Sequence, residues 1–175
     1  MRLSHAPEKT LDQNVPLVVL LVPKGRLTAL PCGELGARAL GLMKSPSWSD
    51  TPLGTLLVHA EAKGGPRALL LVGVGDLKTL DTRRLRRAGI LAGEHGAKLG
   101  AKKVVIAGAG KLELDAASLS AVGEGAVLSS YRYPLKKDEH KAPADVAVVS
   151  SVRGAAAVLK VAAAVAGGQN TAREL

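Results

Sequence analysis

The sequence has 175 residues with a formal net charge of +9, and 47% of the residues are hydrophobic. A chain of this length and apolar content can bury the core of one ordinary domain, which excludes an intrinsically disordered protein. Cys32 is the single cysteine; this excludes an internal disulfide framework and favours a reducing, cytoplasmic setting. The longest apolar run, Val15 to Val22, is far shorter than the roughly 20 residues that span a bilayer, so we expect no membrane partner.

Short runs rich in Val and Leu alternate with longer segments of helical spacing. The runs are almost continuously apolar, which is typical of strands covered on both faces of a parallel sheet. In chain order, the sequence predicts strands over Leu17 to Val22, Leu53 to Ala60, Ala68 to Val74, Lys103 to Ala107 and Asp145 to Val149. It predicts helices over Glu34 to Met43, Thr79 to Leu99, from near Asp115, and over Ser151 to Ala166, and a loop over Tyr133 to Ala144. This order predicts an α/β sandwich with helices on both faces of a mixed, largely parallel sheet.

The predicted helix from Thr79 to Leu99, which Thr79 or Asp81 can cap, lies in the most basic part of the chain. Residues 78–103 hold a net charge of +6 out of the total of +9. Besides Lys78, the basic side chains are Arg83, Arg84, Arg86, Arg87, Lys98, Lys102 and Lys103. These seven are candidates to follow the phosphates of duplex DNA. The alternative is a solvated face whose arginines pair with acidic neighbours.

Aromatic residues are scarce, which narrows the kinds of nucleic acid that this basic chain could bind. Phenylalanine is absent, and Trp48, Tyr131 and Tyr133 are the only aromatic residues. Proteins that bind single strands or RNA loops generally stack bases on aromatic side chains, so the composition disfavours those modules. Duplex binding requires only Lys and Arg and stays open.

Two glycine-containing turns follow predicted strands, at the place where open α/β sheets bind ligands. Gly73 and Gly75 end one strand, and Gly108 and Gly110 follow a later one. Backbone N–H groups at such turns can bind phosphate, so these glycines are candidates for a nucleotide or ADP-ribose loop. However, Lys78 stands where a dinucleotide fingerprint has its third glycine, and tight turns use glycine for structural reasons. A structural role is therefore the simpler interpretation.

Metal ligands and nucleophiles are not grouped along the chain. His5, His59, His95 and His140 are far apart, and Cys32 has no neighbour that would activate it. Two-metal hydrolysis needs clustered carboxylates at a pocket, and the sequence offers no such cluster. We therefore expect no catalytic residue, metal ligand or cofactor in this chain.

The segment EGAVLSSYRY, from Glu124 to Tyr133, is followed by Lys136-Lys137. It resembles a segment of the non-catalytic N-terminal domain of the leucyl aminopeptidase (cytosol aminopeptidase) family, where EG..L..Y.F followed by lysine recurs. Tyr133 departs conservatively from that pattern. Three further segments resemble the family in the same order: LLVGVG from Leu70 to Gly75, LRRAG from Leu85 to Gly89, and QNTAREL from Gln169 to Leu175.

This resemblance implies a three-layer α/β/α fold similar to macro domains, with residues 1–175 forming one accessory domain. Residues 168–175 would begin the linker to a C-terminal catalytic domain that is absent from this sequence. The family implies a hexamer whose catalytic domains hold two divalent metals, zinc or manganese, and release N-terminal amino acids from peptides. No catalytic residue of that kind carries over to this chain.

The resemblance makes an accessory domain, which supports oligomer assembly and shapes access to the active sites, the leading hypothesis for function. Some bacterial members of the family also bind DNA, so duplex binding by the helix with Arg83 to Arg87 is the alternative. A third hypothesis, ADP-ribose binding at the glycine turns, depends on fold analogy alone.

Overall fold

The computed structural model describes residues 1–46, 48–49, 51–61, 64–131 and 141–174. Within them, six strands form one sheet in the order β1-β6-β5-β2-β4-β3. All neighbouring strands are parallel except β3, which runs antiparallel to β4 at one edge. The strands are β1 (Arg2–Ala6), β2 (Leu17–Pro23), β3 (Thr55–His59), β4 (Ala68–Gly75), β5 (Lys103–Gly108) and β6 (Asp145–Val149). The predicted α/β class and the mixed, largely parallel sheet are confirmed.

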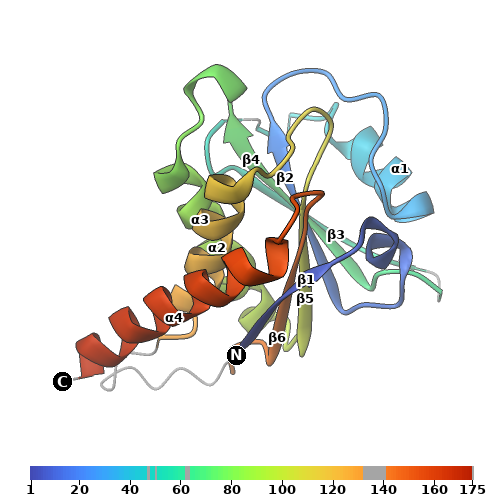
Figure 1. The fold of residues 1–175 in the computed structure, drawn as a ribbon. Helices are drawn as coiled ribbons and strands as arrows, with labels where there is room; N and C mark the ends of the chain where they lie inside the picture. Colours follow the sequence, from blue (N-terminus) through green and yellow to red (C-terminus); the bar gives the residue numbers. More distant parts are fainter. Residues whose placement is uncertain (47, 50, 62–63, 132–140, 175) are drawn as a thin grey trace.

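Helices cover both faces of this sheet, in three layers (Figure 1). One face carries α1 (Gly33–Leu42) and the short 3-10 helix η1 (Glu8–Asp12). The opposite face carries α2 (Thr82–Lys98), α3 (Ala116–Leu128) and α4 (Ala155–Glu174), with a second 3-10 turn, η2 (Leu77–Thr79), before α2. Among the described residues, no helix combines the length and the apolar character needed to cross a membrane.

The central strand β2 shows why the sheet needs a cover on each side. Leu17, Val19 and Leu21 belong to the core beneath α2, α3 and α4. The alternating residues Val18, Leu20 and Val22 belong to a separate core beneath α1. Side chains alternate between the two faces of a strand. A strand that is apolar at every position therefore needs both of its faces covered.

Helix α2 begins at Thr82 rather than at the predicted Thr79, because Leu77–Thr79 form the separate turn η2, and it packs closely against α3. The carboxylate of Asp81 accepts a hydrogen bond from the backbone N–H of Arg84 at 2.7 Å, which confirms Asp81 as the N-cap. A Cβ atom at Gly89 would collide with the carbonyl oxygen of Val122, and one at Gly125 with that of Arg86. The glycines therefore allow the two helix backbones to approach each other.

Three features differ from the sequence-based prediction. The edge strand β1 was not predicted, because Arg2–Ala6 has no continuous apolar run and pairs with β6 far along the chain. The prediction that Leu53 to Ala60 is covered on both faces was wrong: β3 is an edge strand whose Thr55 and His59 are exposed. Helix α4 begins at Ala155 rather than Ser151 and continues through Gly167 and Gly168 to Glu174.

Two other predictions are not tested by this structure. The proposed linker over 168–175 is helical as far as Glu174, and its connection to a further domain stays a prediction. Most of the predicted loop from Tyr133 to Ala144 lies outside the described residues, and only 141–144, which have no helix or strand, can be compared.

Candidate functional site

The turn at the end of β4 is occupied by the chain's own groups. The N–H of Gly73 donates to the carbonyl of Gly54 at 2.8 Å, and its carbonyl accepts from the N–H of Leu53 at 2.7 Å. Gly75 has φ +76, and a Cβ atom there would lie 3.1 Å from Nη1 of Arg84. That guanidinium donates to the carbonyl of Val74 at 3.1 Å. Arg84 thus packs against the turn at Gly75.

The turn after β5 is packed in a similar way. A Cβ atom at Gly108 would collide with the carbonyl oxygen of Leu112, and one at Gly110, which has φ +60, would lie 2.5 Å from Cδ2 of Leu27. The N–H of Ala109 donates to the carbonyl of Leu21 at 3.0 Å. Both glycine turns therefore have a packing reason for their glycines. Ligand binding at Gly73, Gly75, Gly108 and Gly110 stays a prediction.

A depression of about 510 Å³ lies beside these turns, between the starts of α2 and α3. The carboxylates of Asp81 and Asp115, which cap the two helices, are among its lining groups. Hydrogen bonds from the backbone N–H and side chain of Ser118 lower the pKa of Asp115, so its carboxyl group is ionised near neutral pH. An incoming phosphate would have to compete with these two carboxylates for the helix N–H groups.

The structure divides the predicted basic cluster into engaged and free side chains. Arg84 binds the carbonyl of Val74, and Arg86 forms an ion pair with Glu124 of α3, with Nη2 and Oε2 2.6 Å apart. The hydroxyl of Ser120 donates to the other oxygen of Glu124 at 3.1 Å. By contrast, Arg83 and Arg87 are exposed on α2, one helical turn apart.

Two of the three lysines in the cluster are exposed, like Arg83 and Arg87. Lys98 and Lys102 are exposed, whereas Lys103, at the start of β5, is half-buried. Within the described residues, no ion pair involves Arg83, Arg87, Lys98 or Lys102. Of the seven candidates, these four are exposed and available to a partner.

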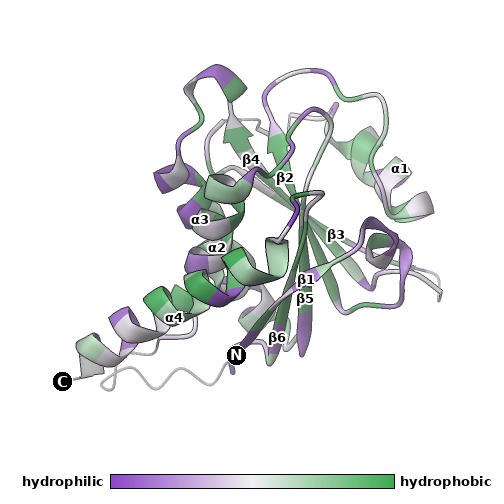
Figure 2. Ribbon diagram, in the orientation of Figure 1, coloured by the Kyte–Doolittle hydropathy of each residue, from purple (hydrophilic) through white to green (hydrophobic). Residues whose placement is uncertain are grey.

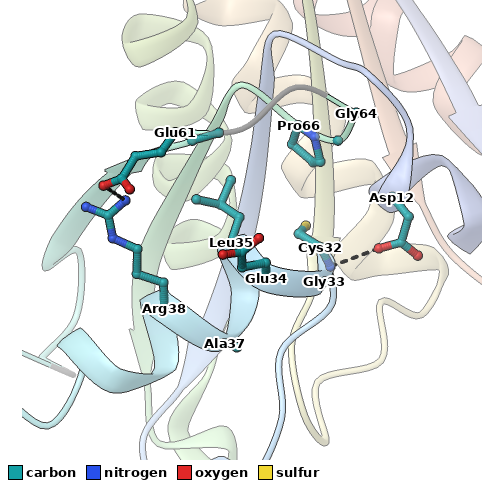
Figure 3. A pocket seen from close by; sticks show the side chains of 12 residues that line it. Asp12, Cys32, Gly33, Glu34, Leu35, Ala37, Arg38, Glu61, Gly64 and Pro66 are labelled. Carbon is teal, nitrogen blue, oxygen red and sulfur yellow. Dashed lines mark hydrogen bonds and ion pairs between the residues drawn. The ribbon is translucent and has the colours of Figure 1, made fainter.

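A cavity of about 570 Å³ lies on the opposite face of the sheet, at the start of α1, and the sequence analysis did not predict it (Figure 3). Its walls come from three separate segments: Asp12 of η1, residues 32–35 and 37–38 at the start of α1, and residues 60–61 and 64–66 between β3 and β4. No motif joins these segments in the sequence. Cys32 itself has a left-handed backbone, with φ 76, directly before α1.

The polar groups that line this cavity are not activated for catalysis. Burial, and then the nearby charge of Asp12, raises the pKa of the Cys32 thiol to about 12, so the sulfur stays protonated. Oδ1 of Asp12 accepts a hydrogen bond from the N–H of Cys32 at 3.1 Å. At the rim, Arg38 and Glu61 form an exposed ion pair of 2.6 Å, which contributes little energy in water. These groups supply neither an activated nucleophile nor a general base.

The ends of α3 and α4 meet, and this brings together the described parts of the two motif segments, residues 124–131 and 169–174; Arg132, Tyr133 and Leu175 lie outside the described residues. The side-chain amide of Asn170 donates to the carbonyl of Val127 at 3.1 Å and lies 3.4 Å from the hydroxyl of Ser130. The hydroxyl of Tyr131 donates to the carbonyl of Arg173 at 3.1 Å. Motifs that are distant in sequence therefore form one structural junction.

No metal-binding arrangement of three or more His, Cys, Asp or Glu side chains is found in the part of the chain that the structure describes. His95, in α2, is half-buried, and the pKa of its imidazole is lowered by burial and by the charge of Lys98, against an opposing effect of Glu94.

Residues 47–140, more than half of the chain, match the family model described as "Cytosol aminopeptidase family, N-terminal domain". No curated protein gives a significant sequence match. The match agrees with the resemblance seen in the segment from Glu124 to Tyr133.

Solved structures share the fold. A mutant of tomato leucine aminopeptidase has a TM-score of 0.70 and 17% identity, over 96% of this chain and 36% of that one. The bottromycin maturation enzyme BotP has a TM-score of 0.63 and 20% identity, over 92% of this chain and 32% of its own. BotP in complex with Mn has a TM-score of 0.55 and 22% identity, over 85% of this chain and 29% of its own. This chain thus spans about a third of the length of these proteins.

Proposed function

This chain belongs to the cytosol aminopeptidase family as its N-terminal domain, and on that premise we propose that it is the non-catalytic domain of a leucyl aminopeptidase-like metalloexopeptidase. The full-length protein would release N-terminal amino acids from peptides with two divalent metals, zinc or manganese, held in a C-terminal catalytic domain. In this proposal the chain supports assembly of the oligomer, a hexamer by analogy with the family, and shapes access to the active sites. The location would be cytoplasmic, which suits a chain with one unpaired cysteine.

One observation carries the proposal: the shared fold accounts for nearly all of this chain but a minor part of the related enzyme. The alignment with tomato leucine aminopeptidase covers 96% of this chain and 36% of that one. In the proposed enzyme, chemistry would belong to the larger remaining part. The N-terminal domain would act through its surfaces, which suits a molecule whose cavity beside α1 holds a neutral thiol and an exposed ion pair.

The first experiment measures hydrolysis of a leucine anilide with zinc or manganese added. The purified chain should show no turnover, and a polypeptide that joins it to the enzyme's catalytic domain should be active. The second experiment compares the sedimentation of that joined polypeptide with that of the catalytic domain alone. We expect a larger assembly when this chain is present. Metal-dependent turnover by the chain on its own, or identical assembly with and without it, would overturn the proposal.

Duplex DNA binding is the second candidate function, and the exposed pair Arg83 and Arg87 is the observation that favours it. Both side chains point away from the core on one side of α2, with Lys98 further along the helix and Lys102 after its end. This arrangement leaves several cations able to contact phosphates without breaking internal bonds.

The DNA test compares Arg83→Ala/Arg87→Ala with Lys9→Ala/Lys24→Ala, which removes two exposed charges elsewhere. The first variant should bind duplex DNA more weakly, and its slope of log affinity against log salt should be flatter by about 0.9 for each lost phosphate contact. The Lys9→Ala/Lys24→Ala control should have a slope closer to that of the wild-type chain. Equal slopes in both variants would eliminate α2 as the contact. Arg84 and Arg86 are left intact because their internal bonds would confound binding with folding.

A further inference from the structure

Helix α4 is apolar on two sides, although only one of them contacts the rest of the domain. Its inner side is buried against α3 and β1 through Ala155, Leu159, Ala162 and Ala166. Its outer side exposes Val161 by 63% and Val165 by 46%. Ala157, Ala164, Gly168 and Ala172 are also exposed and lie at helical spacing on the same side, while the exposed Lys160 and Gln169 lie at its margins. We call the two valines and these four small residues the outer stripe; Figure 2 shows the apolar colour of the middle of α4.

Helix α2, on the same face of the sheet, provides an internal comparison. Its outer side carries Arg83, Arg87, Glu94 and Lys98, all exposed, as is usual for a helix that faces water. In α4, Lys160 is the only charged residue between Ala155 and Ala172. A helix with an apolar stripe on each of two sides is typical of one that is covered on both of them. The outer stripe therefore indicates a missing cover.

We infer that the outer stripe is the docking surface for the catalytic domain of the same polypeptide; this inference rests on the proposed function. The related enzymes contain about two thirds of a chain beyond the shared fold, which supplies a domain of sufficient size. The small residues beside Val161 and Val165 leave room for aliphatic side chains of that domain between them.

A second copy of this chain fits the surface less well. The 20 residues of α4 extend about 30 Å, and two such helices in contact bury less than the roughly 1,200 Å² of a stable interface. A covalently joined domain needs less area, because the connection gives an effective concentration of about a millimolar. The limited size of the outer stripe thus favours a tethered partner.

The surface is also formed before docking. Leu159 anchors the inner side of α4 in the core, and Asn170 and Arg173 bind the end of α3. Little conformational entropy is then lost when a partner binds, so two valines can contribute a useful part of the affinity.

The test variant is Val161→Glu/Val165→Glu. The matched control, Ala116→Glu/Ala117→Glu, introduces two carboxylates at exposed positions of α3. In the 175-residue chain, both variants should keep the wild-type melting temperature, since all four positions are exposed. In the joined polypeptide, limited proteolysis between the domains should be roughly tenfold or more faster for the valine variant than for the control.

Equal proteolysis of the two variants in the joined polypeptide would overturn the inference. So would a 175-residue chain that sediments as a dimer and becomes monomeric in the valine variant, because a second copy would then cover the outer stripe. Aminopeptidase assays of the joined polypeptide separate the two ideas. An inactive polypeptide contradicts the proposed function, whereas an active one with unchanged proteolysis contradicts the docking surface alone.

Discussion

The hydroxyl of Tyr131 donates a hydrogen bond of 3.1 Å to the carbonyl oxygen of Arg173, whose guanidinium lies over the tyrosine ring, 5.6 Å from its centre. The two residues are 42 positions apart and close the junction between the ends of α3 and α4. Because a helix end is easily frayed without such contacts, this pair helps to explain why α4 continues past Gly167 and Gly168.

Replacing Tyr131 by Phe removes the hydroxyl and leaves the ring beneath Arg173. We expect the amides of residues 169–173 to exchange hydrogen several-fold faster, while the free energy of unfolding falls by less than about 1 kcal/mol because the bond is exposed. Hydrogen exchange with mass spectrometry measures the first effect. Tyr131→Ala, which also removes the ring, should increase exchange further. Wild-type exchange rates in Tyr131→Phe would show that the hydroxyl does not hold the helix end.

Replacing glycine by alanine should have opposite effects on stability at Gly125, in the close contact of α2 with α3, and at Gly167, in the open part of α4. Gly125→Ala places a methyl group against the carbonyl oxygen of Arg86, so we expect a loss of about 2 kcal/mol or more in the free energy of unfolding. At Gly167, in α4, nothing lies within 4 Å of an added Cβ. Gly167→Ala should therefore stabilise by up to about 1 kcal/mol, because alanine favours helix. Urea unfolding measures both, and equal effects would contradict the close packing.

The sequence predicted the parts of the fold whose cause is local. Strand β4 is buried along its whole length, and its unbroken apolar run was sufficient to identify it. The sequence limited the cap of α2 to Thr79 or Asp81, because an N-cap depends on its own helix start, and the structure selects Asp81. Strand β1 could not be recognised, since its pairing with β6 depends on residues more than a hundred positions away.

The contacts at the candidate sites could not be predicted either, because they also join residues that are distant in the sequence. The sequence placed Arg84 and Arg86 in one basic cluster, but their partners, Val74 and Glu124, are 10 and 38 positions away. The cavity beside Cys32 combines three segments whose meeting depends on the sheet order. Neither result has a local pattern, so only the tertiary structure separates engaged side chains from free ones.

Arg86 should matter for stability, whereas its neighbour Arg83 should not. Arg86→Met leaves the carboxylate of Glu124, whose side chain is 15% exposed, without its cationic partner. We expect a loss of about 1–2 kcal/mol, reduced from fully buried pairs because Arg86 is partly exposed. Arg83→Met should stay within about 0.5 kcal/mol of wild type. Urea unfolding of both variants, with Glu124→Gln to complete a double-mutant cycle, measures this; equal losses would contradict the pairing.

Cys32 should be inert in the folded protein. Burial and the charge of Asp12 raise the pKa of its thiol to about 12, and the thiolate is the reactive form. We expect slow alkylation by iodoacetamide near about pH 8, the range in which an ordinary cysteine with a pKa near 8.5 reacts readily. Urea should restore the ordinary rate. Rapid labelling of the native chain would show that the cavity beside α1 opens to solvent.

Because of His95, the domain should become less stable as the pH falls below the ordinary pKa of histidine. Burial and the charge of Lys98 lower the pKa of its imidazole in the folded state from the ordinary 6.5. The unfolded chain then binds a proton more readily, so the free energy of unfolding should fall as the pH drops below that value. The effect of Asp115 belongs to more acidic conditions, below its ordinary value of 3.8. Urea unfolding at a series of pH values should show a smaller slope just below pH 6.5 for His95→Gln than for wild type. An unchanged slope would mean that burial of this imidazole does not oppose its protonation.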